Sequence, residues 1–169
     1  EQYQQLNLYI PEAYFNGKTI NGFNAQTAPI FFPNGVGGYM PAKPLSLTGG
    51  KFKDTNNSLI MALSKGFVVA SPGARGRTSA TGKAPAVIVD LKAAVRYLKY
   101  NDKEIPGDAN KIISNGTSAG GASSALLGAS GNQADYEPYL KELGAAPATD
   151  AIFAVSAYCL ITNLENADK

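Results

Sequence analysis

Asn115-Gly-Thr-Ser-Ala-Gly-Gly121 is the stretch of sequence that decides the fold. It contains a G-x-S-x-G match centred on Ser118, with the apolar pair Ile112-Ile113 before it and an Ala/Ser/Leu-rich run, residues 122–129, after it. A strand followed by a helix is the setting of a nucleophile elbow, in which a serine occupies a strained turn between the two. The residues two positions away on either side must then be small, and here both are glycine.

Such an elbow would expose the Ser118 hydroxyl at the start of a helix, which makes Ser118 our candidate nucleophile. The backbone N–H of Ala119 would then face a developing oxyanion, aided by the helix dipole. The alternative is a chance pentapeptide of small residues, since the chain holds 18 glycines. We favour the elbow because a strand precedes the match and a helix follows it.

The chain contains no histidine. A serine needs a general base to become a nucleophile, and histidine is the usual one. The base must therefore be a lysine or lie on another segment of polypeptide, and neither Lys83 nor Lys111 has a spacing relation to Ser118 that supports the first option. No motif indicates a metal or an organic cofactor, and we expect neither.

Composition limits the classes of partner. The 169 residues are enough for one domain with a substantial core, and the net charge of +2 is too small to indicate nucleic acid or a membrane surface. No apolar run reaches the ~20 residues of a spanning helix and no signal peptide is visible, so a cytoplasmic and a secreted location both stay open. The first residue is Glu rather than Met, and we expect the true start to have been removed or to lie upstream. The single cysteine, Cys159, excludes an internal disulfide, and its apolar neighbours predict a buried packing residue.

A second glycine-rich stretch, residues 34–39, follows an apolar strand predicted over Ala28–Pro33. Glycine lets backbone N–H groups turn toward a substrate oxygen without a clash from a Cβ atom. We favour an oxyanion-binding loop here over the alternative of a flexible connection. Arg75 and Arg77 lie in the loop after the next predicted strand, Phe67–Ser71, and are candidates for substrate contact, although arginines in such a loop more often hold it in place.

The remaining patterns predict alternating strands and helices. We expect strands over Leu6–Pro11, before the elbow, and over Ala151–Tyr158. We expect helices from a cap at Asn56 or Asn57 to Lys65, over Pro85–Tyr100, after the elbow, and from a cap at Asp135 to Gly144. Asp90 lies off the apolar stripe of the second helix and is interpreted as a solvated or structural carboxylate. This order predicts a single domain built on a mostly parallel, right-handed α/β sheet.

Five stretches together carry a family resemblance: PNGVGGYMP, GFVVASPGARGRTS, APAVIVDLKAAVRYLKYN, PGDANKIISNGTSAGGASSALLGASGN and DAIFAVSAYC. They are similar to bacterial tannases of the lactobacillus type, serine esterases of the α/β-hydrolase superfamily that cleave galloyl esters. The resemblance implies that residues 1–169 form the N-terminal part of a three-layer hydrolase domain, with the second to sixth strands of its sheet. It also implies that a second polypeptide segment carries the remaining strands, the lid, and the Asp and His of the triad.

The resemblance assigns roles residue by residue. Ser118 matches the nucleophile, and Gly38 and Ala119 match the two oxyanion donors. Two positions depart from related patterns: Leu160 stands where the family has proline, and Thr117 is not the cysteine of the fungal tannase and feruloyl-esterase group. The resemblance therefore implies a serine carboxylesterase acting on galloyl or related small phenolic esters. The alternatives are a feruloyl esterase, another acyl hydrolase or peptidase, and a non-catalytic binding module.

Overall fold

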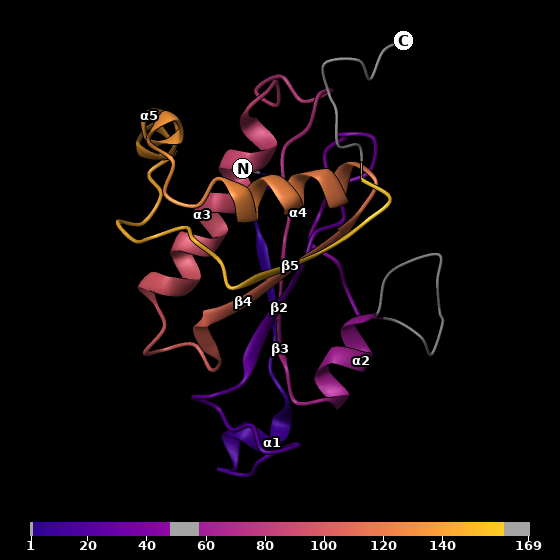
Figure 1. The fold of residues 1–169 in the computed structure, drawn as a ribbon, viewed down its shortest axis with the longest axis vertical. Helices are drawn as coiled ribbons and strands as arrows, with labels where there is room; N and C mark the ends of the chain where they lie inside the picture. The colour runs from indigo at the N-terminus through magenta and orange to yellow at the C-terminus, as the bar shows by residue number, and fades with distance from the viewer. Residues whose placement is uncertain (1, 48–57, 161–169) are drawn as a thin grey trace.

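The computed structural model describes residues 2–47 and 58–160, and it contains one five-stranded sheet (Figure 1). In chain order the elements are β1 (Leu6–Tyr9), α1 (Glu12–Phe15), β2 (Pro29–Pro33), α2 (Ser58–Ser64), β3 (Val68–Pro72), α3 (Ala86–Tyr100), β4 (Asp108–Thr117), α4 (Ala119–Ala129), the 3₁₀ helix η1 (Ala134–Tyr136), α5 (Glu137–Glu142) and β5 (Ala154–Tyr158). Among these described residues, no helix has both the length and the apolar character needed to span a membrane.

The strands lie in the order β1-β3-β2-β4-β5. β1 runs antiparallel to β3, and all the other neighbours are parallel. β3 is buried along its whole length, as expected of a strand covered on both faces of a parallel sheet. The predicted mostly parallel α/β architecture is confirmed.

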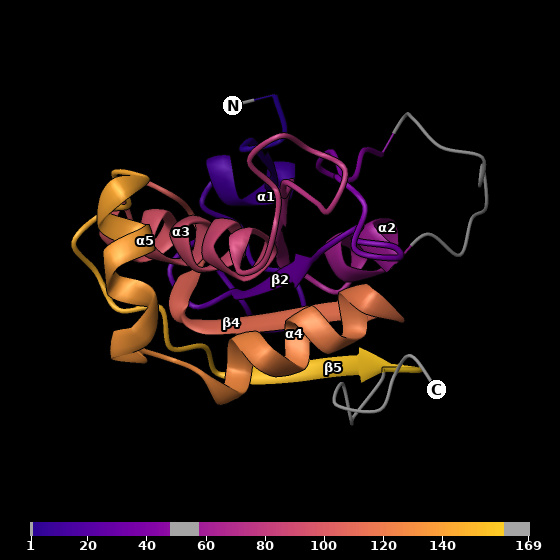
Figure 2. The ribbon, with the colours of Figure 1, turned by 90° about the horizontal axis from the view of Figure 1, so that it is seen from above.

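The helices cover both faces of this sheet. The connection from β2 to β3 moves one way across the sheet, while the connection from β3 to β4 moves back past β2. Right-handed crossovers therefore place α2 and α3 on opposite faces, and Figure 1 shows α2 apart from α3 and α4. α4 contacts α3 and lies along β4 and β5 (Figure 2).

The core fills the space between the sheet and the helices α3 and α4. Its largest fully buried apolar side chains come from the central strands and from these two helices: Ile30, Phe32, Val68, Ile112, Leu91, Val95, Leu98 and Leu127. This burial fixes the ends of β2 and β4 next to each other, which matters for the site described below.

Some local predictions were wrong. The short helix α1 was not expected, and it is anchored by Tyr14, which is buried and donates a hydrogen bond to the Gly66 carbonyl. Asp135 does not cap α5, because it lies inside η1 and so cannot occupy the cap position. Gly144 does end this segment, with a φ of +73°. The expected cap at Asn56 or Asn57 lies outside the described residues.

Cys159 was predicted to be buried, and that prediction was wrong: the thiol is exposed. Cys159 directly follows β5 and has a φ of +48°, so the backbone turns away from the sheet at this residue. The alternation of side chains between the two faces of the sheet therefore ends at Tyr158, and Cys159 does not point into the core.

Candidate active site

Ser118 lies at the junction between β4 and α4. β4 ends at Thr117, α4 begins at Ala119, and Ser118 between them has φ 57° and ψ −123°. That conformation favours glycine, and holding a serine in it costs about 1–3 kcal/mol. The residue is exposed, and among the described residues its hydroxyl has no hydrogen-bond partner. A strained, exposed serine on a strand-to-helix turn has the geometry expected of a nucleophile elbow.

The glycines of the motif are required by close backbone contacts. A Cβ atom on Gly116 would lie 2.3 Å from the Gly120 carbonyl oxygen, and one on Gly120 would lie 2.8 Å from the Val36 carbonyl oxygen. A Cβ atom on Gly121 would lie 2.6 Å from the Tyr158 carbonyl oxygen. Side chains at these positions would force the backbones apart, so the pattern is not an accident of composition.

The backbone N–H of Ser118 donates a 2.9 Å hydrogen bond to the Tyr158 carbonyl at the end of β5. This bond occupies the amide of the serine itself, so it cannot serve a substrate oxygen. The N–H of Ala119 differs, because the first N–H groups of a helix have no intrahelical acceptor. It also lies at the positive end of the α4 dipole.

The loop after β2 reaches the same edge of the sheet, because β2 and β4 are adjacent and parallel. Its Met40 N–H donates to the Gly37 carbonyl at 3.0 Å, and the two residues between them, Gly38 and Tyr39, both have φ of +56°. Positive φ at both central residues is the pattern of a type I′ turn. The Arg77 N–H donates to the Tyr39 carbonyl at 2.8 Å. Gly38 is exposed in a turn held by hydrogen bonds, which argues against the flexible-connection alternative.

Arg75 holds its own loop in place. Its guanidinium contacts the Asp90 carboxylate at 2.8 Å, and its backbone N–H donates to the same carboxylate at 2.8 Å. Asp90 is 4% exposed, which supports the structural interpretation of that residue over the solvated one. The side chain of Arg77 is exposed at the edge where Gly38 lies, so Arg77 is the better placed of the two arginines for substrate contact.

Sequence reasoning missed a buried polar group beside the elbow. The Asn34 side chain lies between the glycine loop and α4, where its amide is within hydrogen-bond distance of Gly120 and Ser124. Asn34 precedes glycine, a pairing that indicates a turn and gives no sign of contacts 86 and 90 residues away.

Three of the buried charged residues in the described part of the chain form a cluster away from Ser118, near the C-terminal end of α4. Lys92 and Arg96 both contact Asp150 at 2.8 Å, and Arg96 also contacts the exposed Glu137. Burial alone would raise the pKa of Asp150, but hydrogen bonds from Lys92, from the Asn132 N–H and from Arg96 hold the pKa below its usual range. The hydrogen bond to Glu137 is the main cause of a raised pKa for Arg96. This cluster serves the packing of α3.

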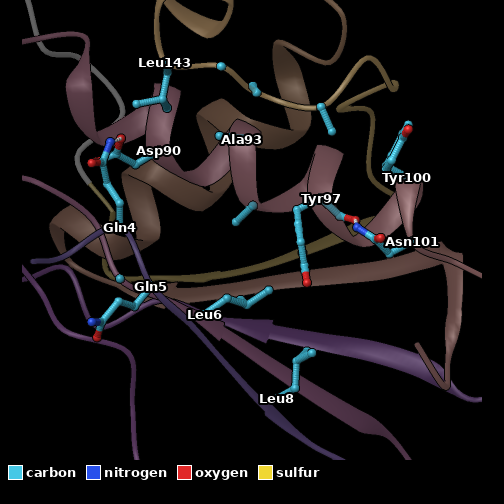
Figure 3. Close-up of a pocket in the computed structure, with 15 residues that line it drawn as sticks. Gln4, Gln5, Leu6, Leu8, Asp90, Ala93, Tyr97, Tyr100, Asn101 and Leu143 are labelled. Atoms are coloured by element: carbon cyan, nitrogen blue, oxygen red, sulfur yellow. Dashed lines mark hydrogen bonds between the residues drawn. The ribbon is translucent and has the colours of Figure 1, made fainter. Parts of the chain in front are cut away.

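A cavity in the described part of the structure is a separate feature. It measures about 720 Å³ and lies between β1, α3 and the segment after α5, with Leu6 and Leu8 on one side and Tyr97 and Tyr100 at one end (Figure 3). Neither Ser118 nor Gly38 lines it. No cluster of three or more His, Cys, Asp or Glu side chains suited to a metal ion occurs in the part of the chain that the structure describes.

Comparison with known proteins finds an esterase and several tannases among the proteins that are similar to this chain. A family described as BD-FAE matches residues 47–169. The esterase LipC of Mycobacterium tuberculosis is 37% identical over 71 residues, which make up 42% of this chain and 17% of LipC. The solved tannase of Fusobacterium nucleatum is 67% identical with a TM-score of 0.94, and the match covers 99% of this chain and 36% of that one.

Two further solved structures agree. The tannase from Lactobacillus plantarum is 54% identical with a TM-score of 0.92, and the match covers 96% of this chain and 36% of that one. A tannin acyl hydrolase in complex with ethyl gallate is also 54% identical with a TM-score of 0.92, at 96% and 37% coverage. The chain thus spans 36–37% of the length of these solved relatives.

These matches confirm the predicted resemblance to bacterial tannases and the α/β-hydrolase character of the sheet. The chain belongs to the BD-FAE family.

Proposed function

We propose that this chain carries the nucleophile and the oxyanion donors of a serine carboxylesterase that hydrolyses galloyl or related phenolic esters. The observation that carries the proposal is the backbone of Ser118, which is held at positive φ with its hydroxyl exposed between β4 and α4. Strain of this kind is maintained at reactive positions, since a packing role would not require it.

The reaction follows from the groups at this edge of the sheet. The Ser118 Oγ attacks the ester carbonyl carbon while its proton passes to a base, and the carbonyl oxygen becomes an oxyanion. The N–H groups of Gly38 and Ala119 stabilise that charge. The tetrahedral intermediate then collapses, the alcohol leaves with the proton, and an acyl-enzyme remains on Ser118. Water repeats the sequence in the second half and releases the acid.

The base comes from a second polypeptide segment in this proposal, because the chain has no histidine. The outer edge of β5 is the docking position for that segment. Phe153, Val155 and Tyr158 are 67%, 38% and 57% exposed there, and β5 pairs with β4 alone within the described residues. An apolar edge strand with unpaired backbone groups invites a further strand. That strand would bring the acid and the histidine near the elbow, as the resemblance implies.

The substrate class rests on the relatives. The matching structures are tannases and tannin acyl hydrolases, one of them bound to ethyl gallate. The identity of 54–67% over nearly the whole chain supports a substrate of the same class here. Arg77 is a candidate contact for the substrate at the exposed face of its loop.

The test uses this chain together with the segment that supplies the base. Gallate, ferulate and acetate esters of one alcohol are compared as substrates for the wild type and for Ser118→Ala. Ser64→Ala is a matched control, since Ser64 is an exposed serine on α2. We expect hydrolysis of the gallate ester by the wild type and the control, and a loss of at least about 10³-fold in Ser118→Ala.

Labelling with a fluorophosphonate separates catalysis from binding. A serine acting as nucleophile is labelled in the wild type and unlabelled in Ser118→Ala. Hydrolysis of the gallate ester by Ser118→Ala at the wild-type rate would rule the proposal out. An unlabelled, inactive wild type that still binds the ester would instead indicate a binding module.

A further inference from the structure

Asn34 directly follows β2, and its side chain is buried between two parts of the candidate site. The residue is 7% exposed. Its Nδ2 lies 3.1 Å from the Asn115 carbonyl oxygen, 3.2 Å from the Gly120 carbonyl oxygen and 2.9 Å from the Ser124 Oγ. Its Oδ1 accepts a 3.2 Å hydrogen bond from the Val36 N–H. One amide therefore joins the glycine loop to both sides of the elbow.

The orientation of this amide follows from its partners. The Val36 N–H can only donate, so it faces Oδ1, while the two backbone carbonyls can only accept and so face Nδ2. We propose that Asn34 is a positioning residue, which fixes the glycine loop against the elbow so that the N–H groups of Gly38 and Ala119 face one point. This inference rests on the function proposed above.

The fit around Asn34 leaves little freedom. A Cβ atom on Gly120 would lie 2.7 Å from the Asn34 Oδ1, and one on Gly116 would lie 2.8 Å from its Nδ2. The amide thus occupies the space that the two glycines of the G-x-S-x-G motif leave open. A Cβ atom on Gly120 would also lie 2.8 Å from the Val36 carbonyl oxygen. The backbone of the glycine loop therefore lies against the first turn of α4.

Ser124 extends the network to β4. It is fully buried on α4 and lies 2.9 Å from the Ser114 Oγ as well as from the Asn34 amide. A fully satisfied buried polar network rigidifies the elements that it joins, because breaking one bond leaves its partners unpaired. On the other side of the turn, the Arg77 N–H holds the Tyr39 carbonyl. Gly38 therefore lies between two fixed points, and Asn34 supplies the one next to Ser118.

The experiment measures kcat, KM and thermal unfolding of Asn34→Ala and Ser124→Ala in the complete protein with a gallate ester. We expect Asn34→Ala to lower kcat by about tenfold or more, since one oxyanion donor is worth about 10²–10³ in turnover. KM should change by less than about twofold, because the donors act mainly on the transition state. Ser124→Ala should lower kcat in the same direction by less, since it removes a single partner of the amide.

Asn132→Ala is the control. Its side-chain oxygen also holds a loop, accepting from Thr149 Oγ1 at 2.6 Å and from the Asp150 N–H at 3.0 Å, but it lies beyond the far end of α4 from Ser118. It should lower the unfolding temperature and leave kcat unchanged. The pH profile of kcat should keep its shape in the Asn34 variant, because the Asn34 amide does not titrate.

Two results would overturn the inference. The first is wild-type kcat in Asn34→Ala and Ser124→Ala combined with lower unfolding temperatures, which would show a purely structural role. The second is unchanged kcat in Ser124→Ala alone, which decides the matter if Asn34→Ala does not fold. A wild type without esterase activity would refute the proposed function, and the inference with it, before any variant is compared.

Discussion

Gly120 shows at the scale of one residue how closely another segment of the chain approaches the elbow. Its missing side chain leaves room for the Asn34 amide and the Val36 carbonyl, both within 2.8 Å of where a Cβ atom would stand. The need for a small residue at Gly116 is local, because a Cβ atom there would lie 2.3 Å from the Gly120 carbonyl oxygen, four residues along the chain. A local requirement leaves a local pattern, so the sequence alone predicted this turn.

Gly120→Ala should therefore disturb both stability and labelling. Overpacking of this kind costs about 1–3 kcal/mol of unfolding free energy, and here it would push the loop away from α4. Thermal unfolding and the rate of fluorophosphonate labelling measure the two effects. Gly37→Ala is the stability control, since no atom lies within 4 Å of where its Cβ atom would stand. Equal unfolding temperatures for the two variants would contradict the contact argument.

Asn34 could not be predicted in the same way. The partners of its Nδ2 lie 81 to 90 residues further along the chain and meet it only because β2 and β4 become neighbours in the sheet. The order of strands decides that meeting, and no short-range pattern reports it. The ion pair between Arg75 and Asp90 was likewise not predicted. The predicted order of strands did place the Arg75 loop at the end of β3.

Helix α3 marks the limit of prediction at the scale of elements. Its range was predicted to within one residue at the N-terminus, because the apolar positions recur with a helical period. Its buried charges were not predicted: Lys92 is fully buried and Arg96 is 8% exposed. Periodicity identifies the face toward the sheet, whereas burial against the segment around Asp150 depends on a second layer of packing.

The Asp150 cluster should make stability sensitive to acid. Because the pKa of Asp150 is lower in the folded than in the unfolded state, its contribution is present above the unfolded pKa of about 3.9 and is lost as pH falls through the folded value. Denaturant unfolding from pH 7 down to about pH 2 should show this loss, and Asp150→Asn should flatten the dependence.

At neutral pH the same variant should lose about 3–5 kcal/mol of unfolding free energy, because Lys92 would remain buried without its counter-charge. Asp108→Asn is the comparison. Asp108 forms a 2.9 Å ion pair with the more exposed Lys111, and its loss should cost no more than about 1 kcal/mol. Similar losses in the two variants would argue against a special role for burial.

At the scale of the whole molecule, the five-stranded sheet has two outer strands of different character. β1 is half-buried along its length, while β5 exposes Val155 and Tyr158. The alternation of strands and helices was enough to predict the sheet and its mostly parallel direction. It did not predict the cavity beside β1, because that depends on how far α3 stands from the sheet edge.

The chain studied without a further segment should self-associate through β5. Exposed apolar edge strands pair with one another, and a charge on the edge suppresses this. Val155→Lys should therefore shift the protein toward monomer in sedimentation or size-exclusion experiments at increasing concentration. Thr78→Lys, on the exposed loop after β3, adds the same charge elsewhere and should leave association unchanged. A wild type that stays monomeric at every concentration would contradict the predicted self-association through β5.

The hydrogen bond from the Ser118 N–H to the Tyr158 carbonyl links the backbone of the candidate nucleophile to the outer strand β5. Tyr158 is the last residue of β5, so a strand that paired with the outer edge of β5 would hold in place the residue that accepts from Ser118. We therefore expect Ser118 to be acylated faster when that further strand is paired with β5. Local opening of β5 should slow acylation at temperatures below that of global unfolding.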